Sequence, residues 1–329
     1  ICCKPGKVGV KNFMKFEKRI ITTLLIFCTL SLHAQLVPED AVPEKVADGY
    51  KFTEGPALAP DGSIYFTDIP AALILRFDPK TGKTAIAEEN SGNANGLMFD
   101  HDGVLIACRH GAREVSSWSL KRSPQRFSPA VSQRYNGKKL NSPNDLDIDK
   151  SGNIYFTDPR YGNRDSMEME IEGVYFQGIE SDGNKAMKPL IRIDADLVRP
   201  NGIVLSPDES ILYVADRKAN YIYAYDIESP GKVKNKRVFA RLNGGEGPGS
   251  DGMCVDQQGR LYATGFSKVW VFEPTGQLVA TIPVAKPTIN VTFAEDNKTL
   301  YITANKGLYR MSLNTDAPLK HTKYSKDKE

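Results

Sequence analysis

The sequence predicts an all-β protein, a six-bladed β-propeller whose ring is closed by an N-terminal strand. Two observations predict this fold. A two-strand pattern recurs six times, and its spacing of 39 to 57 residues is that of a propeller blade. A length of 329 residues would suit two average domains, but all-β folds of this size often form one.

Each copy combines a short apolar strand, a turn containing Asp, Gly or Asn, and a second strand centred on an aromatic or aliphatic residue. Apolar alternation in residues 73–79 and 221–227 supplies outer strands. The copies are EGPALAPDGSIYFTD from Glu54, NGLMFDHDGVLIACR from Asn95, NDLDIDKSGNIYFTD from Asn144, NGIVLSPDESILYVAD from Asn201, DGMCVDQQGRLYATG from Asp251 and NVTFAEDNKTLYITAN from Asn290.

The sixth copy is short of a strand, because only about 24 residues separate Asn290 from a polar tail. We expect the segment around residues 44–52 to supply the missing strand. Pairing of this segment with the sixth copy would close the ring and cover an open sheet edge.

The N-terminal region has the order of a secretory signal, with MKFEKRI from Met14, the apolar stretch ITTLLIFCTL, and SLHA ending at Ala34. The apolar stretch is too short to span a bilayer. We expect cleavage after Ala34 and a periplasmic or secreted protein, with residues 1–13 as upstream sequence. The expected organisation is upstream residues and signal peptide at 1–34, a catalytic propeller at 35–315 and a polar tail at 316–329.

Removal of residues 1–34 takes away six Lys or Arg residues and one Glu, which changes the formal net charge from +3 to about −2. Without residues 1–34 the chain is not basic, so its charge does not indicate a nucleic-acid or membrane partner. Cys108 and Cys254 remain, in copies on opposite sides of a six-membered ring. We expect buried free thiols rather than a disulfide, even in an oxidising compartment.

The first residues of the six copies share one register, eleven or twelve positions before the centre of the second strand, and all are carboxylates or amides. Because the first strand of a blade lines the channel, we expect these oxygens to meet at one mouth. Such donors favour Ca²⁺ or Mg²⁺, with Mn²⁺ also suited, over a structural zinc site. The alternative is that Asn and Asp simply favour turns before strands. That alternative does not explain Glu54 or the single register.

Residues just after each second strand are expected on the rim of the same mouth, because that strand runs back antiparallel to the first. His110 is the histidine that falls there, and it would either contact substrate or shuttle a proton, or be structural. Arg160 and Arg217 could orient an acidic or polyhydroxylated substrate, or be ordinary surface arginines. Tyr161 on the rim and Asn95 in the oxygen register are further candidate substrate contacts.

Several other chemistries lack their usual residues. The sequence contains no G-x-S-x-G elbow, Walker loop, C-x-x-C pair or H-E-x-x-H motif. The glycine-rich stretch at 244–252 precedes a strand rather than a helix, so it lacks the helix N-terminus that would bind phosphate. Serine hydrolase, nucleotide-binding and zinc protease functions are therefore not supported.

The region from about 45 to 312 resembles the gluconolactonase, regucalcin and senescence-marker-protein family of lactone hydrolases. The similarity lies in EGP at 54–56, NSPNDL at 141–146, TDPRYG at 157–162, RPNGIVLSPD at 199–208 and SDGM at 250–253.

This resemblance implies a six-bladed propeller with a divalent metal, commonly Ca²⁺ and in some members Zn²⁺. It implies that Glu54, Asn201 and Asp251 bind the metal, that Asn144 lies beside metal and substrate, and that Asp251 is also the catalytic base. Vertebrate members carry an arginine shortly before the position of Asn144. Here Ser142 and Pro143 occupy that stretch, as in the bacterial gluconolactonase branch.

The function expected from these observations is metal-dependent hydrolysis of a sugar lactone to its aldonic acid. One alternative is related metal chemistry on an aryl ester or phosphotriester, since the same electrophilic metal serves both reactions. Another is a non-catalytic propeller that binds sugars or proteins. The expected partner is a small-molecule lactone, without nucleic acid, and without a membrane after signal cleavage. The sequence leaves monomer and dimer open.

Overall fold

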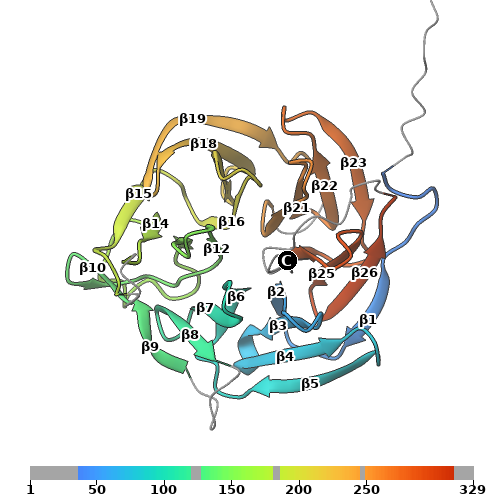
Figure 1. Ribbon diagram of the computed structural model, residues 1–329, viewed down its shortest axis with the longest axis horizontal. Coiled ribbons are helices and arrows are strands. Elements are labelled where there is room, and N and C mark those ends of the chain that lie inside the picture. Colours follow the sequence, from blue (N-terminus) through green and yellow to red (C-terminus); the bar gives the residue numbers. More distant parts are fainter. Residues whose placement is uncertain (1–35, 120–126, 181–185, 245–248, 315–329) are drawn as a thin grey trace, which may run out of the picture. The chain divides into compact units, whose positions relative to one another are not determined.

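The computed structural model describes residues 36–119, 127–180, 186–244 and 249–314. In these residues six four-stranded antiparallel sheets surround one axis as the blades of a β-propeller, as the sequence predicted (Figure 1). The expected signal peptide and polar tail lie outside the described residues, so both stay predictions. None of the described residues forms a helix long and apolar enough to cross a membrane.

The two strands of each sequence repeat form the two inner strands of one blade. The innermost strands are β2 (Thr53–Leu58), β6 (Ala94–Phe99), β12 (Leu146–Ile148), β16 (Pro200–Leu205), β20 (Met253–Val255) and β24 (Thr288–Phe293). The second strands are β3 (Ile64–Asp68), β7 (Val104–Arg109), β13 (Ile154–Asp158), β17 (Ile211–Asp216), β21 (Leu261–Gly265) and β25 (Thr299–Ala304).

The two outer positions come from the segments between repeats. The third strands are β4 (Leu73–Asp78), β8 (Glu114–Ser119), β14 (Gly173–Gln177), β18 (Tyr221–Ser229), β22 (Lys268–Phe272) and β26 (Gly307–Ser312). The outermost strands are β5 (Lys83–Glu88), β9 (Phe127–Ser132), β15 (Ile191–Asp194), β19 (Lys232–Arg241), β23 (Leu278–Pro283) and β1 (Glu44–Asp48). A short 3₁₀ helix, η1 (Ile69–Ala71), and a small hairpin, β10 (Arg134–Tyr135) with β11 (Lys138–Lys139), complete the described elements.

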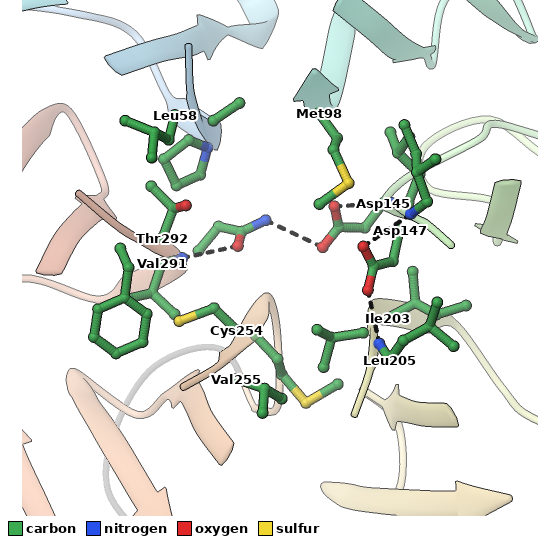
Figure 2. Close-up of a pocket in the computed structure, with 18 of the residues that line it drawn as sticks. Leu58, Met98, Asp145, Asp147, Ile203, Leu205, Cys254, Val255, Val291 and Thr292 are labelled. Carbon is green, nitrogen blue, oxygen red and sulfur yellow. Dashed lines mark hydrogen bonds between the residues drawn. The ribbon is translucent and has the colours of Figure 1, made fainter. Parts of the chain in front are cut away.

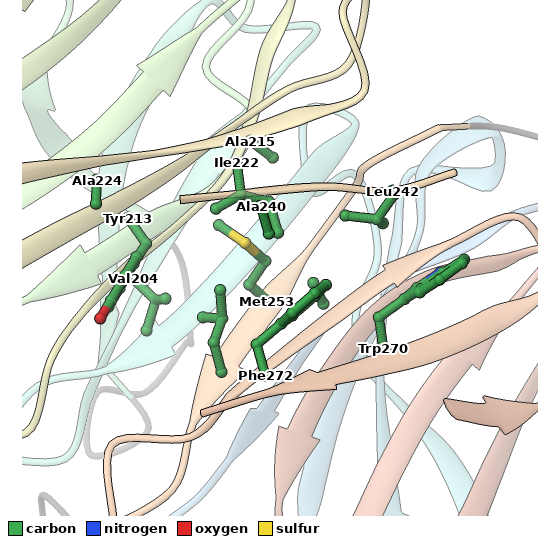
Figure 3. Close-up of a cluster of buried hydrophobic side chains, with 12 residues drawn as sticks. Val204, Tyr213, Ala215, Ile222, Ala224, Ala240, Leu242, Met253, Trp270 and Phe272 are labelled. Carbon is green, nitrogen blue, oxygen red and sulfur yellow. The ribbon is translucent and has the colours of Figure 1, made fainter. Parts of the chain in front are cut away.

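The second strands hold neighbouring blades together because their side chains alternate between two blade interfaces. In β17, Tyr213 packs toward blade five, whereas Leu212 and Val214 pack toward blade three. Figure 3 shows the interface that contains Tyr213, together with Met253 and Phe272 of blade five. Every adjacent pair of blades shares one such cluster of buried apolar side chains.

The N-terminal strand closes the ring, as predicted. β1 pairs antiparallel with β26, with Glu44 opposite Arg310 and Asp48 opposite Gly307 (Figure 1). Arg310 Nε also donates to Glu44 Oε2 at 2.8 Å. The sixth sheet therefore joins both ends of the propeller, and this pairing protects the outer edge of β26.

The two cysteines of the propeller are free thiols, as predicted. Cys108 is fully buried in blade two, whereas Cys254 in blade five is half-buried and lines the central channel. Burial raises the pKa of both thiols, which keeps them protonated and unreactive near neutral pH.

Candidate active site

The residues of the predicted oxygen register lie together at one end of the innermost strands. Each is either within its strand or two residues before it. All of their side chains are buried, with no more than 4% of any residue exposed. The set comprises Glu54, Asn95, Asn144, Asn201, Asp251 and Asn290.

Glycines let these strands approach one another closely at that end. A Cβ atom added to Gly202 would lie 2.2 Å from the carbonyl oxygen of Asp251 on the next blade. A Cβ atom added to Gly252 would lie 2.0 Å from the side-chain Cγ of Asn290. The Asn-Gly and Asp-Gly pairs at these positions therefore do more than form turns, because the glycine makes room for the neighbouring site residue.

Four buried oxygens in this register have no hydrogen-bond partner in the described part of the chain. They are Oδ1 of Asn95, Asn144, Asn201 and Asp251. Leaving several buried acceptors unpaired is costly, and proteins rarely do so without a ligand. Acceptors of this kind suit a hard divalent cation, because carboxylate and amide oxygens are its preferred ligands.

The donor set contains few of the groups that bind softer metals. Within the described ranges, no cluster of three or more His, Cys, Asp or Glu side chains could hold an ion by itself. A cation at this end of the channel would therefore depend on amide oxygens. This composition agrees with the predicted preference for Ca²⁺ or Mg²⁺ over a thiolate or imidazole zinc site.

Glu54 shares a hydrogen-bond donor with a second carboxylate. Asn290 Nδ2 donates to Glu54 Oε2 at 3.0 Å and to Asp145 Oδ2 at 3.2 Å. Figure 2 shows the Asp145 carboxylate pointing into the channel. Burial, with the nearby Asp251 and Asp145 carboxylates, raises the pKa of Glu54 well above its usual range. Burial likewise raises the pKa of Asp145 to about 8. A cation among these groups would relieve their mutual repulsion.

Asp251 forms a buried ion pair with Arg217. Arg217 Nη1 contacts Asp251 Oδ2, while Asp251 Oδ1 is one of the four unpaired oxygens. Burial raises the pKa of Asp251 to about 6, and the Arg217 guanidinium limits that rise. The carboxylate is thus held by one oxygen and presents the other to the site.

Asn201 is oriented in a similar way by Tyr161. Asn201 Nδ2 donates to the Tyr161 hydroxyl at 3.0 Å, which leaves Asn201 Oδ1 unpaired. Arg199 and Arg217 lie over the Tyr161 ring, with their guanidinium carbons 5.6 and 5.7 Å from its centroid. Tyr161 therefore fixes a site amide and supports the arginine that pairs with Asp251.

Comparison with known proteins identifies the family of the chain. A family profile described as the SMP-30/Gluconolactonase/LRE-like region matches residues 52–306, which include the whole oxygen register. The chain belongs to this family. Among its relatives, a gluconolactonase from Zymomonas mobilis is 32% identical over 83% of this chain and 81% of that protein. A diisopropyl-fluorophosphatase from Loligo vulgaris is 26% identical over 80% of this chain and 88% of that protein.

Solved structures of the family share the same ring. A gluconolactonase from Xanthomonas campestris superposes with a TM-score of 0.75 at 30% sequence identity, covering 86% of this chain and 92% of that one. The resemblance read from the sequence is thereby confirmed, together with the propeller it implied.

In the present protein, His110 directly follows β7 and lies on the rim of the site. Its backbone N–H donates to the carbonyl oxygen of Asn93 at 3.2 Å, and its imidazole is half-buried. Burial and the neighbouring Arg160 guanidinium lower the pKa of His110 to about 4. The imidazole is consequently neutral near pH 7 and offers one donor and one acceptor.

Arg160 braces the loop between β13 and β14. Its guanidinium donates to the carbonyl oxygens of Asn163 and Asn141 and to the hydroxyls of Ser142 and Ser166. These four acceptors occupy most of its N–H groups. Its role as a substrate contact stays a prediction, and the structure adds a clear structural role.

A cavity of about 760 Å³ occupies the channel on the other side of the register. It is lined by the later parts of the innermost strands, including Leu58, Met98, Ile203, Leu205 and Val255 (Figure 2). Its walls are largely aliphatic, but Asp145 and Asn290 of the site also line it, whereas His110 and Tyr161 do not. The cavity therefore reaches the site from the side opposite the rim.

One residue of the site, Asp145, and one contact, between Arg217 and Asp251, were not predicted from the sequence. Asp145 could have been found, because the third repeat has Asp where the first, second, fourth and fifth have Gly. The pairing of Arg217 with Asp251 had no comparable signal. It depends on the direction of a long side chain across a blade boundary.

Proposed function

We propose that the protein is a metal-dependent lactonase that opens a sugar lactone to its aldonic acid. The observation that carries the proposal is the set of four buried, unpaired oxygens on Asn95, Asn144, Asn201 and Asp251. The family relationship supports the reaction class, since a relative 32% identical is named a gluconolactonase.

We assign the cation to Glu54, Asn144, Asn201 and Asp251, with Ca²⁺ as the favoured ion and Mg²⁺, Mn²⁺ and Zn²⁺ as alternatives. When bound, such an ion supplies Lewis-acid polarisation of the lactone carbonyl and stabilises the negative charge that develops on its oxygen. Glu54 and Asp251 provide the two negative charges that balance a dication.

Asp251 acts as the base in this proposal. Its Oδ1 has no hydrogen-bond partner and carries two lone pairs, so one lone pair can bind the cation while the other accepts a proton from the attacking water. The water oxygen bonds to the carbonyl carbon, the ring C–O bond breaks, and the departing ring oxygen takes up a proton. The product is the open-chain hydroxy acid.

The rim and register supply groups for substrate contact. Neutral His110 can hydrogen-bond a ring oxygen or hydroxyl, and Asn95 presents an unpaired Oδ1 from the second blade. Tyr161 fixes Asn201 and borders the same opening. Arg160 is assigned to the same rim as a contact for sugar hydroxyls.

Chelation tests the metal requirement directly. Purified protein is assayed on glucono-δ-lactone with a pH indicator, before and after EDTA treatment and after return of Ca²⁺, Mg²⁺, Mn²⁺ or Zn²⁺. We expect loss of turnover with EDTA and recovery with Ca²⁺. Full turnover by protein shown by elemental analysis to be free of metal would refute metal dependence.

Replacement of the base tests its role separately. Asp251→Asn is expected to lower kcat by about 100-fold or more, in the range usual for loss of a general base. If Asp251→Asn kept both its bound metal and the wild-type rate, Asp251 would not be the base.

A second candidate is hydrolysis of an aryl ester or phosphotriester, favoured by the relative named a diisopropyl-fluorophosphatase. Measurement of kcat/KM on aldonolactones, aryl acetates and a dialkyl fluorophosphate decides between them. We expect the highest value for an aldonolactone. Saturable sugar binding without turnover of any of these substrates would instead indicate a binding protein.

We also propose that the enzyme works in the periplasm or outside the cell. The signal-like order of residues 14–34 supports export. Cell fractionation with N-terminal sequencing tests this, with the expected first residue being Gln35. Recovery of uncleaved protein in the cytoplasm would contradict it.

A further inference from the structure

The two carboxylate oxygens of Asp251 have different surroundings. Oδ2 is paired with Arg217, whereas Oδ1 is buried and unpaired. The Asp251 side chain is 0% exposed, so water does not supply the missing partner at the surface. The ion pair therefore leaves one defined oxygen for a ligand and prevents free rotation of the carboxylate.

The Arg217 guanidinium also contacts the Tyr161 ring, in addition to its ion pair with Asp251. Arg217 follows β17 directly, and its side chain is one-quarter exposed at 25%. The Tyr161 hydroxyl accepts a hydrogen bond from Asn201. One tyrosine thus connects the side chain that fixes Asp251 with the amide that presents Asn201 Oδ1.

The charge of this arrangement is unbalanced. Glu54 and Asp145 are buried and share a neutral donor, Asn290, and both are repelled by the buried Asp251 carboxylate. Among the described residues, Arg217 is the cation within ion-pair distance of any of these three carboxylates. It is therefore the resident positive charge of the site.

We infer that Arg217 is a positioning residue that holds Asp251 by one oxygen and, as a fixed positive charge, weakens the binding of a divalent cation. The inference rests on the metal centre of the proposed function. Arg217 and the cation bind different oxygens of Asp251, so Arg217 stays in place when the ion binds.

Two opposite effects follow from this placement. Without metal, Arg217 stabilises the fold, because a buried carboxylate that loses its partner is strongly destabilising. With metal, the same guanidinium repels the ion at short range. Removal of its charge should thus weaken the metal-free protein and tighten cation binding together, which a purely structural arginine would not do.

The experiment compares wild type with Arg217→Met and Arg217→Lys by calorimetric titration of chelator-treated protein with Ca²⁺. We expect the Kd of Arg217→Met to fall by about tenfold or more. Arg217→Lys keeps the charge and should stay within about threefold of wild type. The thermal midpoint of metal-free Arg217→Met should fall, and its rise on Ca²⁺ addition should exceed that of wild type.

Arg241→Met is the matched control. Arg241 is exposed and lies on β19, the outermost strand of the same blade, whereas the register lies at the innermost strands. Its guanidinium carbon is 5.5 Å from the centroid of the Tyr221 ring. Its loss should leave the Ca²⁺ affinity unchanged.

The outcomes separate the two proposals. A wild-type protein that binds no divalent ion would refute the metal centre itself. A wild-type protein that binds Ca²⁺ while Arg217→Met binds it equally or more weakly would overturn only the inference about Arg217. If Arg217→Met folds only with Ca²⁺ and wild type folds without it, the expected loss of metal-free stability is observed. The affinities are then compared by chelator competition on the Ca²⁺-loaded proteins, and an Arg217→Met protein that releases Ca²⁺ as readily as wild type would overturn the inference.

Discussion

Asn290 Nδ2 donates to Glu54 Oε2 at 3.0 Å, which links two residues 236 positions apart in the sequence. Glu54 belongs to the first repeat and Asn290 to the last. This hydrogen bond therefore closes the inner end of the ring, as the pairing of β1 with β26 closes its outer end. The site and the closure of the fold share the same residues.

Replacement of Asn290 by Ala should destabilise the metal-free protein. Glu54 and Asp145 both lose their shared donor, and a lost hydrogen bond to a buried acceptor costs about 1–3 kcal/mol. Urea unfolding of chelator-treated protein measures the change. An unfolding free energy equal to that of wild type would show that the two carboxylates do not depend on Asn290.

Glu54→Gln should separate stability from metal binding. The change removes one of three neighbouring buried carboxylates, so the metal-free protein should gain about 1 kcal/mol of unfolding free energy. It also removes a charged ligand, so Ca²⁺ affinity should fall by about 100-fold or more. Thermal unfolding and calorimetric titration measure the two effects.

Glu44→Gln is the control for this substitution. Glu44 is an exposed acid on β1 that pairs with Arg310, remote from the register. It should leave Ca²⁺ affinity unchanged. Glu54→Gln protein that still binds Ca²⁺ as tightly as wild type would remove Glu54 from the ligand set.

Gly202→Ala should disrupt the site through packing alone. The added Cβ would lie 2.2 Å from the Asp251 carbonyl oxygen, so the two strands must move apart. We expect a loss of about 2 kcal/mol or more, at the upper end of overpacking effects. Gly178→Ala, where the nearest atoms are side-chain carbons of Lys188 and Phe176 at 3.2 Å, should cost much less. Equal effects of the two substitutions would contradict the close approach at Gly202.

His110 should contribute to acid sensitivity. Its pKa is lowered to about 4 in the folded protein, below the usual 6.5, so the unfolded chain binds the proton more readily between these values. Stability is then complete above about pH 6.5 and declines as the pH falls toward 4. Between pH 7 and 5, the unfolding free energy of His110→Gln should fall by about 2 kcal/mol less than that of wild type. Identical pH dependence in urea unfolding would contradict the depressed pKa.

Most of the fold could be predicted from the repeats. Each repeat contains the innermost strand, which lines the channel, and the second strand, which packs against the neighbouring blades. The outer strands at 73–79 and 221–227 and the closing strand at Glu44 could be predicted, since local pattern and chain length determine them. The register of oxygen-bearing residues was found for the same reason.

Contacts between blades were harder to foresee. The bond from Asn290 to Asp145 joins blades six and three across the channel. The pair between Arg217 and Asp251 depends on how a flexible side chain turns at a blade boundary. Neither relationship has a fixed sequence spacing, so the sequence alone does not predict either contact.

A crystal structure of the protein grown with Ca²⁺ tests the account most directly. We predict one ion bound by oxygens of Glu54, Asn144, Asn201 and Asp251 at about 2.3–2.6 Å, with Arg217 still paired to the other oxygen of Asp251. An ion bound elsewhere, with those four side chains unliganded, would contradict it.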